Sequence, residues 1–304
     1  MSLDRKDFII TGSDERESEK SLRPNISYWQ DAWRRLKKKP LAIIALGLLT
    51  TIILMCIFGP MLSPYKDFQQ NGSLINKVPF GNHYFGTDHL GRDIFVRLWK
   101  GGRVSIEIGL MAAFIEMFLG TIYGGVSGYL GGVTDDIMMR IVEVINGIPY
   151  MIIVILVSIA LGKGIFSLII ALCITAWTGI ARVVRGQVLQ LKESEYILAA
   201  KILGASVPRI ILKHLIPNTF GVIIIYMTFD IPAFIFAEAF LSFIGLGVQP
   251  PNTSWGSMCA VGQTQMSFYP YQLIFPAVAI SLTMLSFNLL GDGLRDALDP
   301  KLRQ

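Results

Sequence analysis

Four ionisable side chains lie inside or beside long apolar stretches of the sequence. Arg140 and Glu143 are three residues apart, so on a helix they could pair on one face. Asp230 and Glu238 lie within a later apolar stretch. An ionised group at the centre of a bilayer costs about 3 kcal/mol or more, so each should face protein or water. Two interpretations remain open: neighbours in a subunit interface satisfy these groups, or they line a pathway or gate where Asp230 or Glu238 meets a cationic group of a cargo.

The sequence contains no pattern that supports catalysis. It lacks a phosphate-binding G-x-x-x-x-G-K-[ST] loop, an HExxH pair and a CxxC pair. The histidines and cysteines have no metal-ligand spacing: His83, His89, His214, Cys56, Cys173 and Cys259. We therefore expect no catalytic residue, no metal site and no cofactor on this chain. Energy for any transport must come from a partner or from an ion gradient.

The composition indicates a membrane protein. Of 304 residues, 52% are hydrophobic and 16% are charged, whereas a soluble domain has about 25% charged residues. A helix needs about 20 apolar residues to cross a bilayer core. The sequence predicts an all-α integral membrane protein with six transmembrane helices, at residues 41–61, 104–126, 144–161, 165–181, 220–243 and 273–290. The second of these stretches also contains Glu107 and Glu116.

The distribution of Lys and Arg predicts the orientation. Basic residues are retained on the cytoplasmic side of short loops, which places the tail (residues 1–40), loop 182–217 and the C-terminus in the cytoplasm. Residues 62–103 form the outer loop, and the basic residues there are an exception to the rule. We expect an uncleaved anchor, because no cleavage site follows the first apolar stretch. The net charge of +5 follows from this bias, so we expect no nucleic-acid partner.

The polar tail ends in a predicted amphipathic helix, residues 28–39. Trp29, Trp33 and Leu36 share one helical face, and basic residues surround them. Such a helix is typical of a membrane-surface anchor in contact with the lipid bilayer. The alternative is a solvated helix whose Trp residues pack on cytoplasmic protein.

The loop at residues 182–217 is unusually long, and long connections are usually functional or disordered. Its pattern predicts a helix over Val188–Leu203 and a left-handed turn at Gly204. Ser206 could then cap a second short helix that runs to His214 before Pro217 stops it. Small residues would allow another protein to approach this hairpin closely: Ala199, Ala200, Gly204 and Ala205.

The segments YILAAKILGAS (196–206) and HLIPN (214–218) resemble the EAA loop of ATP-binding-cassette importer permeases. The resemblance implies a coupling helix seated in a cleft of a cytoplasmic ATPase. Two positions depart from the generic pattern, Leu198 at the acidic position and His214 at an aliphatic one, and both resemble the peptide-permease branch. The coupling residues that the resemblance implies are Ala199, Ala200, Gly204, Ala205, Ser206, His214, Pro217 and Asn218.

Further segments resemble the C-type subunit of dipeptide and oligopeptide permeases: FGTDHLGRD (85–93), DDIMMRIVE (135–143) with Pro149, LSFIGLGVQPP (241–251) and SWG (254–256). The resemblance implies a type I importer bundle in the inner membrane. It implies a second homologous permease, two ATPases that carry ATP and Mg, and an extracytoplasmic peptide-binding protein. Short peptides are the expected cargo, although relatives carry nickel chelates, glutathione or antimicrobial peptides. The main alternative is an ion-coupled secondary transporter, but no internal repeat typical of one is visible.

Two outer segments of this resemblance have two possible roles. The pattern of residues 86–93 predicts a turn followed by the start of a helix. Residues 245–256, which are rich in Gly and Pro, are predicted to form a fixed turn. Both are expected to be packing elements. The alternative is that Asp88, Arg92 and Asp93 form a docking surface for the binding protein, and that residues 245–256 handle substrate directly.

Overall fold

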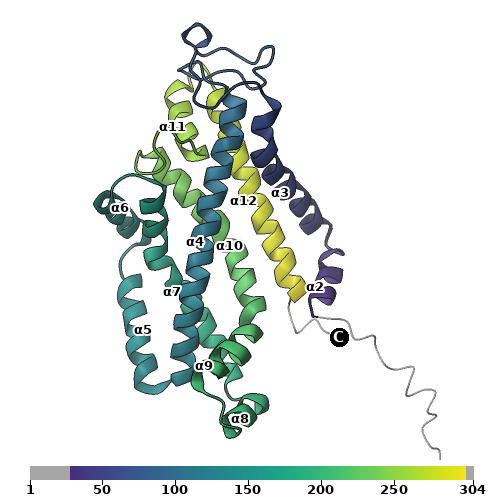
Figure 1. The fold of residues 1–304 in the computed structure, drawn as a ribbon, viewed down its shortest axis with the longest axis vertical. Coiled ribbons are helices and arrows are strands. Elements are labelled where there is room, and N and C mark those ends of the chain that lie inside the picture. The colour runs from purple at the N-terminus through teal and green to yellow at the C-terminus, as the bar shows by residue number, and fades with distance from the viewer. Residues whose placement is uncertain (1–27, 299–304) are drawn as a thin grey trace, which may run out of the picture.

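The computed structural model describes residues 28–298, and this part of the chain consists of helices and loops (Figure 1). Most of the predicted tail, residues 1–27, and the last six residues lie outside it. The helices are α2 (Tyr28–Leu36), α3 (Pro40–Phe58), α4 (Ile94–Leu130), α5 (Gly132–Asn146), α6 (Tyr150–Leu161), α7 (Ile165–Leu191), α8 (Glu195–Ile202), α9 (Val207–Ile210), α10 (Ile216–Phe243), α11 (Trp255–Gln265) and α12 (Tyr271–Leu298). Short 3₁₀ turns follow α3 at Gly59–Leu62 and occur in the loop before α4 at Gly72–Leu74.

Five helices in the described residues are long and apolar enough to cross a membrane, and a sixth crossing results if the bent pair α5 and α6 counts as one. The stretch predicted as the third span, 144–161, is broken at residues 147–149, and the two helices meet at 81°. Pro149 explains the break, because it lacks an amide donor and disfavours helical geometry at Ile148. Helices α4, α7, α10 and α12 extend past their predicted limits, as α4 does from Ile94 to Leu130.

A row of glycines brings α4 and α7 into backbone contact. Gly120, Gly124 and Gly128 lie four residues apart and so share one face of α4. A Cβ added at Gly120 would lie 2.6 Å from the Trp177 carbonyl oxygen, and one at Gly128 would lie 2.9 Å from the Arg185 carbonyl oxygen. Larger side chains would push the helices apart. Small residues at this spacing are the usual means of close helix packing in membranes.

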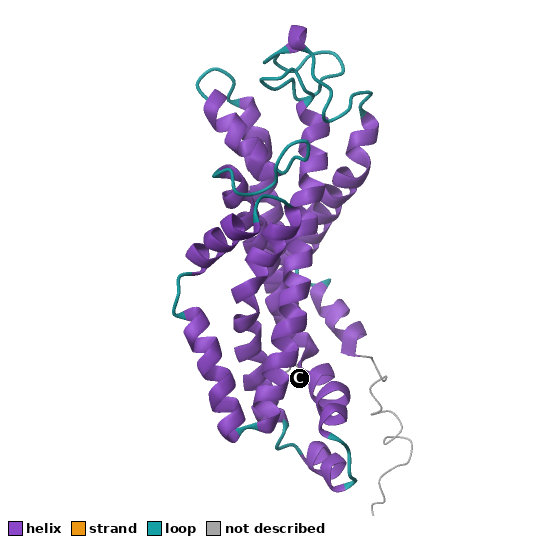
Figure 2. Ribbon diagram, turned by 60° about the vertical axis from the view of Figure 1, so that its left-hand side comes forward, coloured by secondary structure: helices purple, strands orange, loops and turns teal. Residues whose placement is uncertain are grey.

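The bundle has two different ends (Figures 1 and 2). We call the end formed by residues 59–93, the 244–254 loop and α11 the loop end. The opposite end, with α8 and α9, is the hairpin end. Helices α4 and α10 pack on each other, and α12 packs on α3 and α10. The short α2 packs on α12 through the buried Leu36, while Trp33 remains 47% exposed.

Candidate functional site

The turn of the hairpin depends on Gly204. Its φ of +80° is left-handed, and nothing lies within 4 Å of a Cβ added there, so the requirement is conformational and not steric. The Gly204 amide donates to the Lys201 carbonyl at 3.0 Å, and the Ala205 amide donates to the Ala200 carbonyl at 3.0 Å. This pair of bonds is a Schellman motif, which closes the C-terminus of α8. The structure therefore has the left-handed turn that the sequence predicts.

The hairpin has a buried side and an exposed apolar tip. Ile197 is buried and belongs to the same cluster as Ile210 and Leu215. At the tip, Ile202 is 85% exposed and Leu203 is 86% exposed. Two large, solvent-exposed aliphatic side chains on a turn of fixed geometry are typical of a contact surface for another protein.

The predicted first helix of the hairpin is interrupted. Instead of a continuous helix over Val188–Leu203, α7 ends at Leu191 and α8 begins at Glu195. Ser194 stands at the start of α8, and its hydroxyl donates to the Leu191 carbonyl at 2.5 Å. Local hydrogen bonds of this kind compete with helix continuation, which explains the break. The consequence is that α8 can take a direction different from that of α7.

The second correction concerns Pro217, which does not stop the helix. It lies in the first turn of α10, where the missing amide donor is tolerated. A π-helical segment, Ile211–Leu215, precedes it and joins α9 to α10. The Asn218 amide donates to the His214 carbonyl at 2.6 Å, so a side chain supplies a bond near the proline. The chain therefore runs as helix from α9 into α10.

The remaining predicted coupling residues lie along the same hairpin. Ser206 has the extended backbone of an N-cap, but its side chain forms no capping hydrogen bond. Ala199, Gly204, Ser206, Pro217 and Asn218 are exposed, and Ala200, Ala205 and His214 are half-buried. Asn218 also donates to the Tyr196 hydroxyl at 3.3 Å, which links α10 to α8.

A charged hollow of about 700 Å³ lies between α5 and α7, and its lining consists of Asp136, Met139, Arg140, Glu143, Arg182 and Arg185. Arg140 and Glu143 form the predicted pair, with a nitrogen-to-oxygen distance of 2.7 Å, and both side chains are exposed. Arg182 is also exposed and was not singled out by the sequence. Charged side chains of α5 and of α7 thus line the same hollow, which could hold water.

A second ion pair fixes the base of that hollow. Asp135 is buried, and the Arg185 Nε donates to its carboxylate at 2.6 Å. Ser127 at the end of α4 donates to the same carboxylate. Asp135 therefore joins α4, α5 and α7, and it holds α5 in place below the bend.

The acidic residues further along the bundle have different surroundings. Asp230 in α10 is half-buried. Glu116 in α4 is buried, lies close enough to Asp230 for their charges to interact, and has one carboxylate oxygen without a hydrogen-bond partner in the described chain. The sequence alone gave no reason to single out Glu116. These two carboxyl groups are the acidic candidates for a pathway or for a contact with a second subunit.

Glu238 is fully buried and well satisfied. The Ser105 hydroxyl of α4 donates to one carboxylate oxygen at 2.7 Å, and the Ser242 hydroxyl of α10 donates to the other at 2.7 Å. Side chains of the chain itself therefore satisfy this carboxylate, whereas the first of the two interpretations given above placed the satisfying neighbours in a subunit interface.

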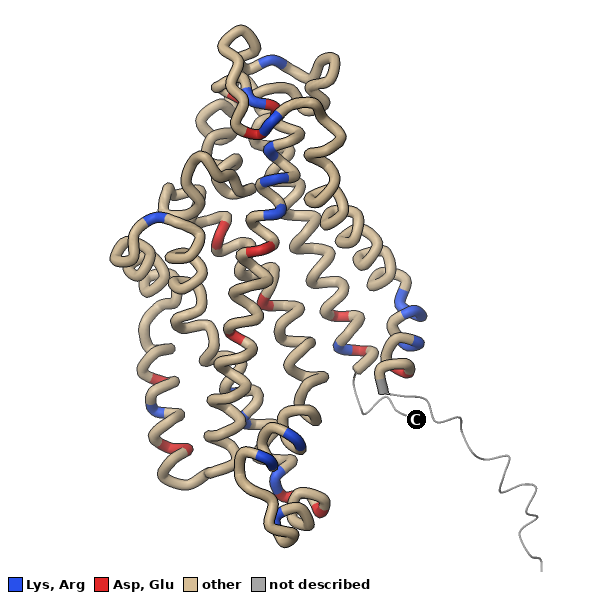
Figure 3. Tube along the Cα trace, in the orientation of Figure 1, with Lys and Arg blue, Asp and Glu red and all other residues tan. Residues whose placement is uncertain are grey.

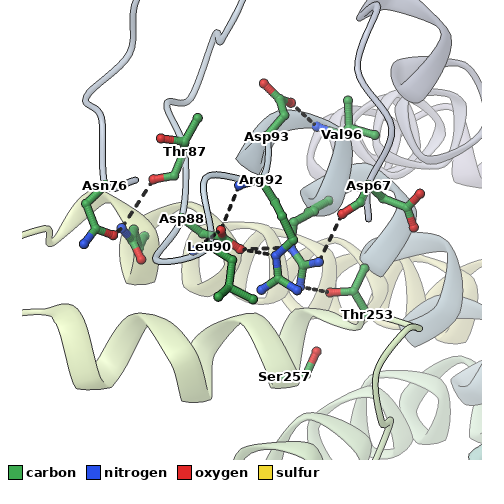
Figure 4. Close-up of polar contacts among 12 residues, drawn as sticks. Asp67, Asn76, Thr87, Asp88, Leu90, Arg92, Asp93, Val96, Thr253 and Ser257 are labelled. Atoms are coloured by element: carbon green, nitrogen blue, oxygen red, sulfur yellow. Dashed lines mark hydrogen bonds and ion pairs between the residues drawn. The ribbon is translucent and has the colours of Figure 1, made fainter. Parts of the chain in front are cut away.

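Three polar residues of the predicted docking segment build the core of the loop end (Figure 4). Asp88 is buried, and its carboxylate accepts from the Leu90 and Arg92 amides at 2.9 Å and from the Arg92 Nε at 2.7 Å. The neighbouring Arg97 lies 3.5 Å from Asp88 and also donates to the Thr253 hydroxyl at 3.1 Å. Asp88 thus connects the start of α4 to the loop before α11.

Asp93 is the third of these residues, and it caps α4. One carboxylate oxygen accepts from the Val96 amide at 2.8 Å, and the other lies 2.7 Å from the His83 Nδ1. Both side chains are buried, and the His83 ring stacks on Tyr65 with centroids 4.0 Å apart. Burial lowers the pKa of His89 in the same segment. The arrangement favours the packing interpretation of the segment.

Several of the basic residues that are exceptions to the orientation rule have partners at the loop end, where Figure 3 shows charges of both signs together. Lys100 lies 2.8 Å from Asp67. The Arg103 guanidinium donates to the carbonyls of Cys56 at 3.2 Å and Ile57 at 3.0 Å, near the C-terminus of α3. A cation is favourable at that helix terminus. These contacts explain how the loop end can carry several basic residues.

Comparison with known proteins decides the family. The sequence profile described as the binding-protein-dependent transport system inner membrane component matches residues 118–304. The chain belongs to this family. A second profile, the N-terminal TM domain of oligopeptide transport permease C, matches residues 27–79. The chain is therefore a non-catalytic inner-membrane permease component, as the sequence predicts.

Similar proteins cover nearly the whole chain. The dipeptide transport system permease protein DppC of Bacillus subtilis is 53% identical over 98% of this chain and 93% of its own. The oligopeptide transport system permease protein OppC of the same organism is 49% identical over the full length of both. The glutathione transport system permease protein GsiD of Escherichia coli is 41% identical over 90% of this chain and 91% of its own. The predicted resemblance to the peptide-permease C branch is confirmed.

Proposed function

We propose that this permease carries short peptides, dipeptides or oligopeptides, across the cytoplasmic membrane as one subunit of an ATP-driven importer. The observation that carries the proposal is the similarity to the DppC and OppC proteins over essentially the whole chain, at 53% and 49% identity. Its partners would be a second homologous permease, two ATPase subunits that bind ATP and Mg, and an extracytoplasmic peptide-binding protein. The N- and C-termini and the hairpin end would be cytoplasmic.

The hairpin is the proposed coupling element. The tip residues Ile202 and Leu203 would insert into a cleft of the ATPase, because they are almost fully exposed and apolar. ATP-driven closure of the ATPase pair would move the segment from Ala199 to His214. That motion would tilt α5 to α7 and α10 and change the side from which the pathway is open.

The charged hollow is the proposed cytoplasmic part of the pathway. Arg140, Glu143 and Arg182 line a space of about 700 Å³, which is large enough for a short peptide with its water. Asp230 lies further along the bundle on α10 and would face the same route. Exposed charges on membrane helices are typical of substrate pathways, because they need water or protein around them.

The binding protein would dock at the loop end. Asp88, Arg92 and Asp93 would contribute by fixing the shape of the loop, since their side chains are largely buried. Contact with the partner would then fall to exposed neighbours such as Val78, which is 62% exposed, and Phe68, which is 59% exposed.

Glutathione is a second candidate cargo. The observation that favours it is the 41% identity to the GsiD protein. Because glutathione is itself a small modified peptide, the same pathway could accept both cargoes. The binding protein would then make the choice.

Reconstitution tests the proposal. The chain would be purified in proteoliposomes alone and with its co-purified partners, and uptake of a labelled dipeptide, a labelled pentapeptide and labelled glutathione would be measured with internal or external ATP. We expect ATP-dependent uptake only in the complete assembly. Uptake by the chain alone would overturn the proposal, as would uptake that an uncoupler abolishes while ATP stays high. Uptake of glutathione without either peptide would replace the cargo by the second candidate.

A further inference from the structure

Glu238 and its hydrogen bonds connect four segments near the loop end: α4, α10, the 244–254 loop and α11. Its carboxylate accepts from Ser105 in α4 and from Ser242 in α10, both at 2.7 Å. Ser105 in turn accepts from the Trp255 amide of α11 at 3.2 Å. Ser242 accepts from the Val248 amide of the 244–254 loop at 3.0 Å. One carboxylate therefore determines where four segments meet.

The directions of these bonds give Glu238 a defined role. Each serine oxygen accepts from a backbone amide, so each serine hydroxyl is free to donate, and the carboxylate accepts from both. The Ser254 hydroxyl also donates to Ser242 at 3.3 Å. Through Ser105, the carboxylate lies one hydroxyl group away from the first amide of α11. The N-terminus of a helix has partial positive charge, which favours an acidic group there.

The segments around Glu238 are closely packed. A Cβ added at Gly247 would collide with Ser242, and one at Gly256 would collide with the backbone of Ala239. Trp255 is fully buried, and its ring nitrogen donates to the Leu98 carbonyl at 2.8 Å. The 244–254 loop and the start of α11 thus lie directly on α10 and α4.

We propose that Glu238 is a positioning residue that fastens the 244–254 loop and α11 to α4 and α10, so that these segments move as one block when the loop end of the pathway opens. The inference rests on the proposed transport function for its consequence, but the fastening itself is a property of this chain. Glu238 contacts no cargo in this arrangement. Its effect on transport passes through Ser105 and Ser242.

The reactivity of Cys259 can report whether α11 is detached from the bundle. It lies on α11 and is half-buried, whereas Cys56 and Cys173 are buried in the bundle. Detachment of α11 would expose Cys259 without exposing Cys173. The rate of alkylation by a membrane-impermeant maleimide, followed for each cysteine peptide by mass spectrometry, therefore measures the fastening directly.

The test compares Glu238→Gln and Ser105→Ala with the natural chain in the assembled complex. Thr264→Ala is the matched control, because Thr264 is exposed on α11 and, within residues 28–298, its hydroxyl bonds only the Val261 carbonyl. We expect alkylation of Cys259 to rise about fivefold or more in both variants, the effect of losing one buried hydrogen bond. Cys173 and the control should show no change. Peptide should also leak from proteoliposomes without ATP in the two variants.

Three results would overturn the inference. The first is an unchanged Cys259 rate in both variants. The second is an equal rise at Cys173, which would mean general loosening of the bundle. The third is a KM that rises in Glu238→Gln for peptides with a free amino terminus but not for N-acetylated peptides, with Cys259 unchanged, because Glu238 would then recognise the cargo. If Glu238→Gln fails to assemble, the alkylation rate of Cys259 in Ser105→Ala still tests the inference. Labelling does not require transport, so failure of the proposed function leaves this test intact.

Discussion

The two ends of the bundle differ in their most unusual side chains. At the loop end, charged and polar groups are buried and find their partners within the chain, as Asp88, Asp93 and Glu238 do. At the hairpin end, large apolar side chains are exposed, with Ile202 and Leu203 as the extreme cases. A buried polar group is tolerated only when it is hydrogen-bonded, and an exposed apolar tip is favourable only when something covers it.

This difference leads to a hypothesis about how each end responds to substitution. The loop end has a shape that the chain maintains by itself, so substitutions there should first affect folding or rigidity. In the proposed assembly a partner covers the hairpin end, so substitutions there should first affect coupling to that partner. The predictions below test that division, beginning with the largest effect.

Replacement of Trp255 by Ala should cause the largest loss of stability. The side chain is fully buried and donates to the Leu98 carbonyl at 2.8 Å, and such truncations cost about 3–5 kcal/mol. We expect a low yield and a strongly reduced thermal midpoint of the purified complex, measured by intrinsic fluorescence. The matched control is Trp33→Ala in α2, where the side chain is 47% exposed. Equal midpoints for the two variants would contradict a self-contained loop end.

Replacement of Gly204 by Val should affect coupling and leave stability nearly unchanged. A β-branched residue is strained at φ +80°, by about 1–2 kcal/mol, so the turn should open and move the tip. We expect peptide uptake to fall about tenfold while ATP hydrolysis continues, as measured in the same proteoliposomes. Gly204→Asn should retain most of the uptake, because Asn tolerates the left-handed region.

Gly47→Val is the matched control for that experiment, because Gly47 is exposed on α3 and has nothing within 4 Å of an added Cβ. It should change neither uptake nor ATP hydrolysis. Full coupled transport by Gly204→Val would show that the turn is not needed for transmission of ATPase motion.

The pair Ile202→Ser and Leu203→Ser should weaken the contact with the ATPase. Burial of an aliphatic side chain contributes about 1.5–3 kcal/mol, so loss of either should raise the dissociation constant about tenfold or more. The measurement is binding of the purified ATPase to the permease in nanodiscs. Leu212→Ser is the control, since Leu212 is 61% exposed but lies away from the tip. Equal weakening by all three substitutions would mean that the tip has no special role.

Much of the fold follows from local features of the sequence. Apolar stretches locate the long helices, and the left-handed turn at Gly204 is predictable because few residues other than glycine adopt that geometry. The bend before α6 was missed, although Pro149 gave a visible signal. Hydropathy alone does not distinguish a straight helix from two joined by a break.

The polar connections of the site were harder to predict. Ser105, Glu238 and Trp255 meet in space but lie up to 150 residues apart in the chain, and no periodicity connects such distant positions. Arg182 and the glycine row at Gly120, Gly124 and Gly128 were also missed. The glycine row has a readable signal, four-residue spacing of small residues in an apolar helix. Arg182 has no such signal in the sequence, because its position beside the hollow depends on α5 folding beside α7.

Separation of the Arg140–Glu143 pair should have the smallest effect on stability. A change in transport could then not be attributed to unfolding, so this substitution tests the role of the hollow directly. Both side chains are exposed, by 78% and 57%, and exposed ion pairs contribute about 0–1 kcal/mol. Arg140→Gln should leave the thermal midpoint within error. If the hollow carries cargo, the same variant should change the KM for peptide by about twofold to tenfold through the loss of one charge beside the route. Arg295→Gln, on the distant end of α12, should change neither quantity. A shifted midpoint with unchanged KM would reverse the assignment and make the hollow a structural element like the loop end.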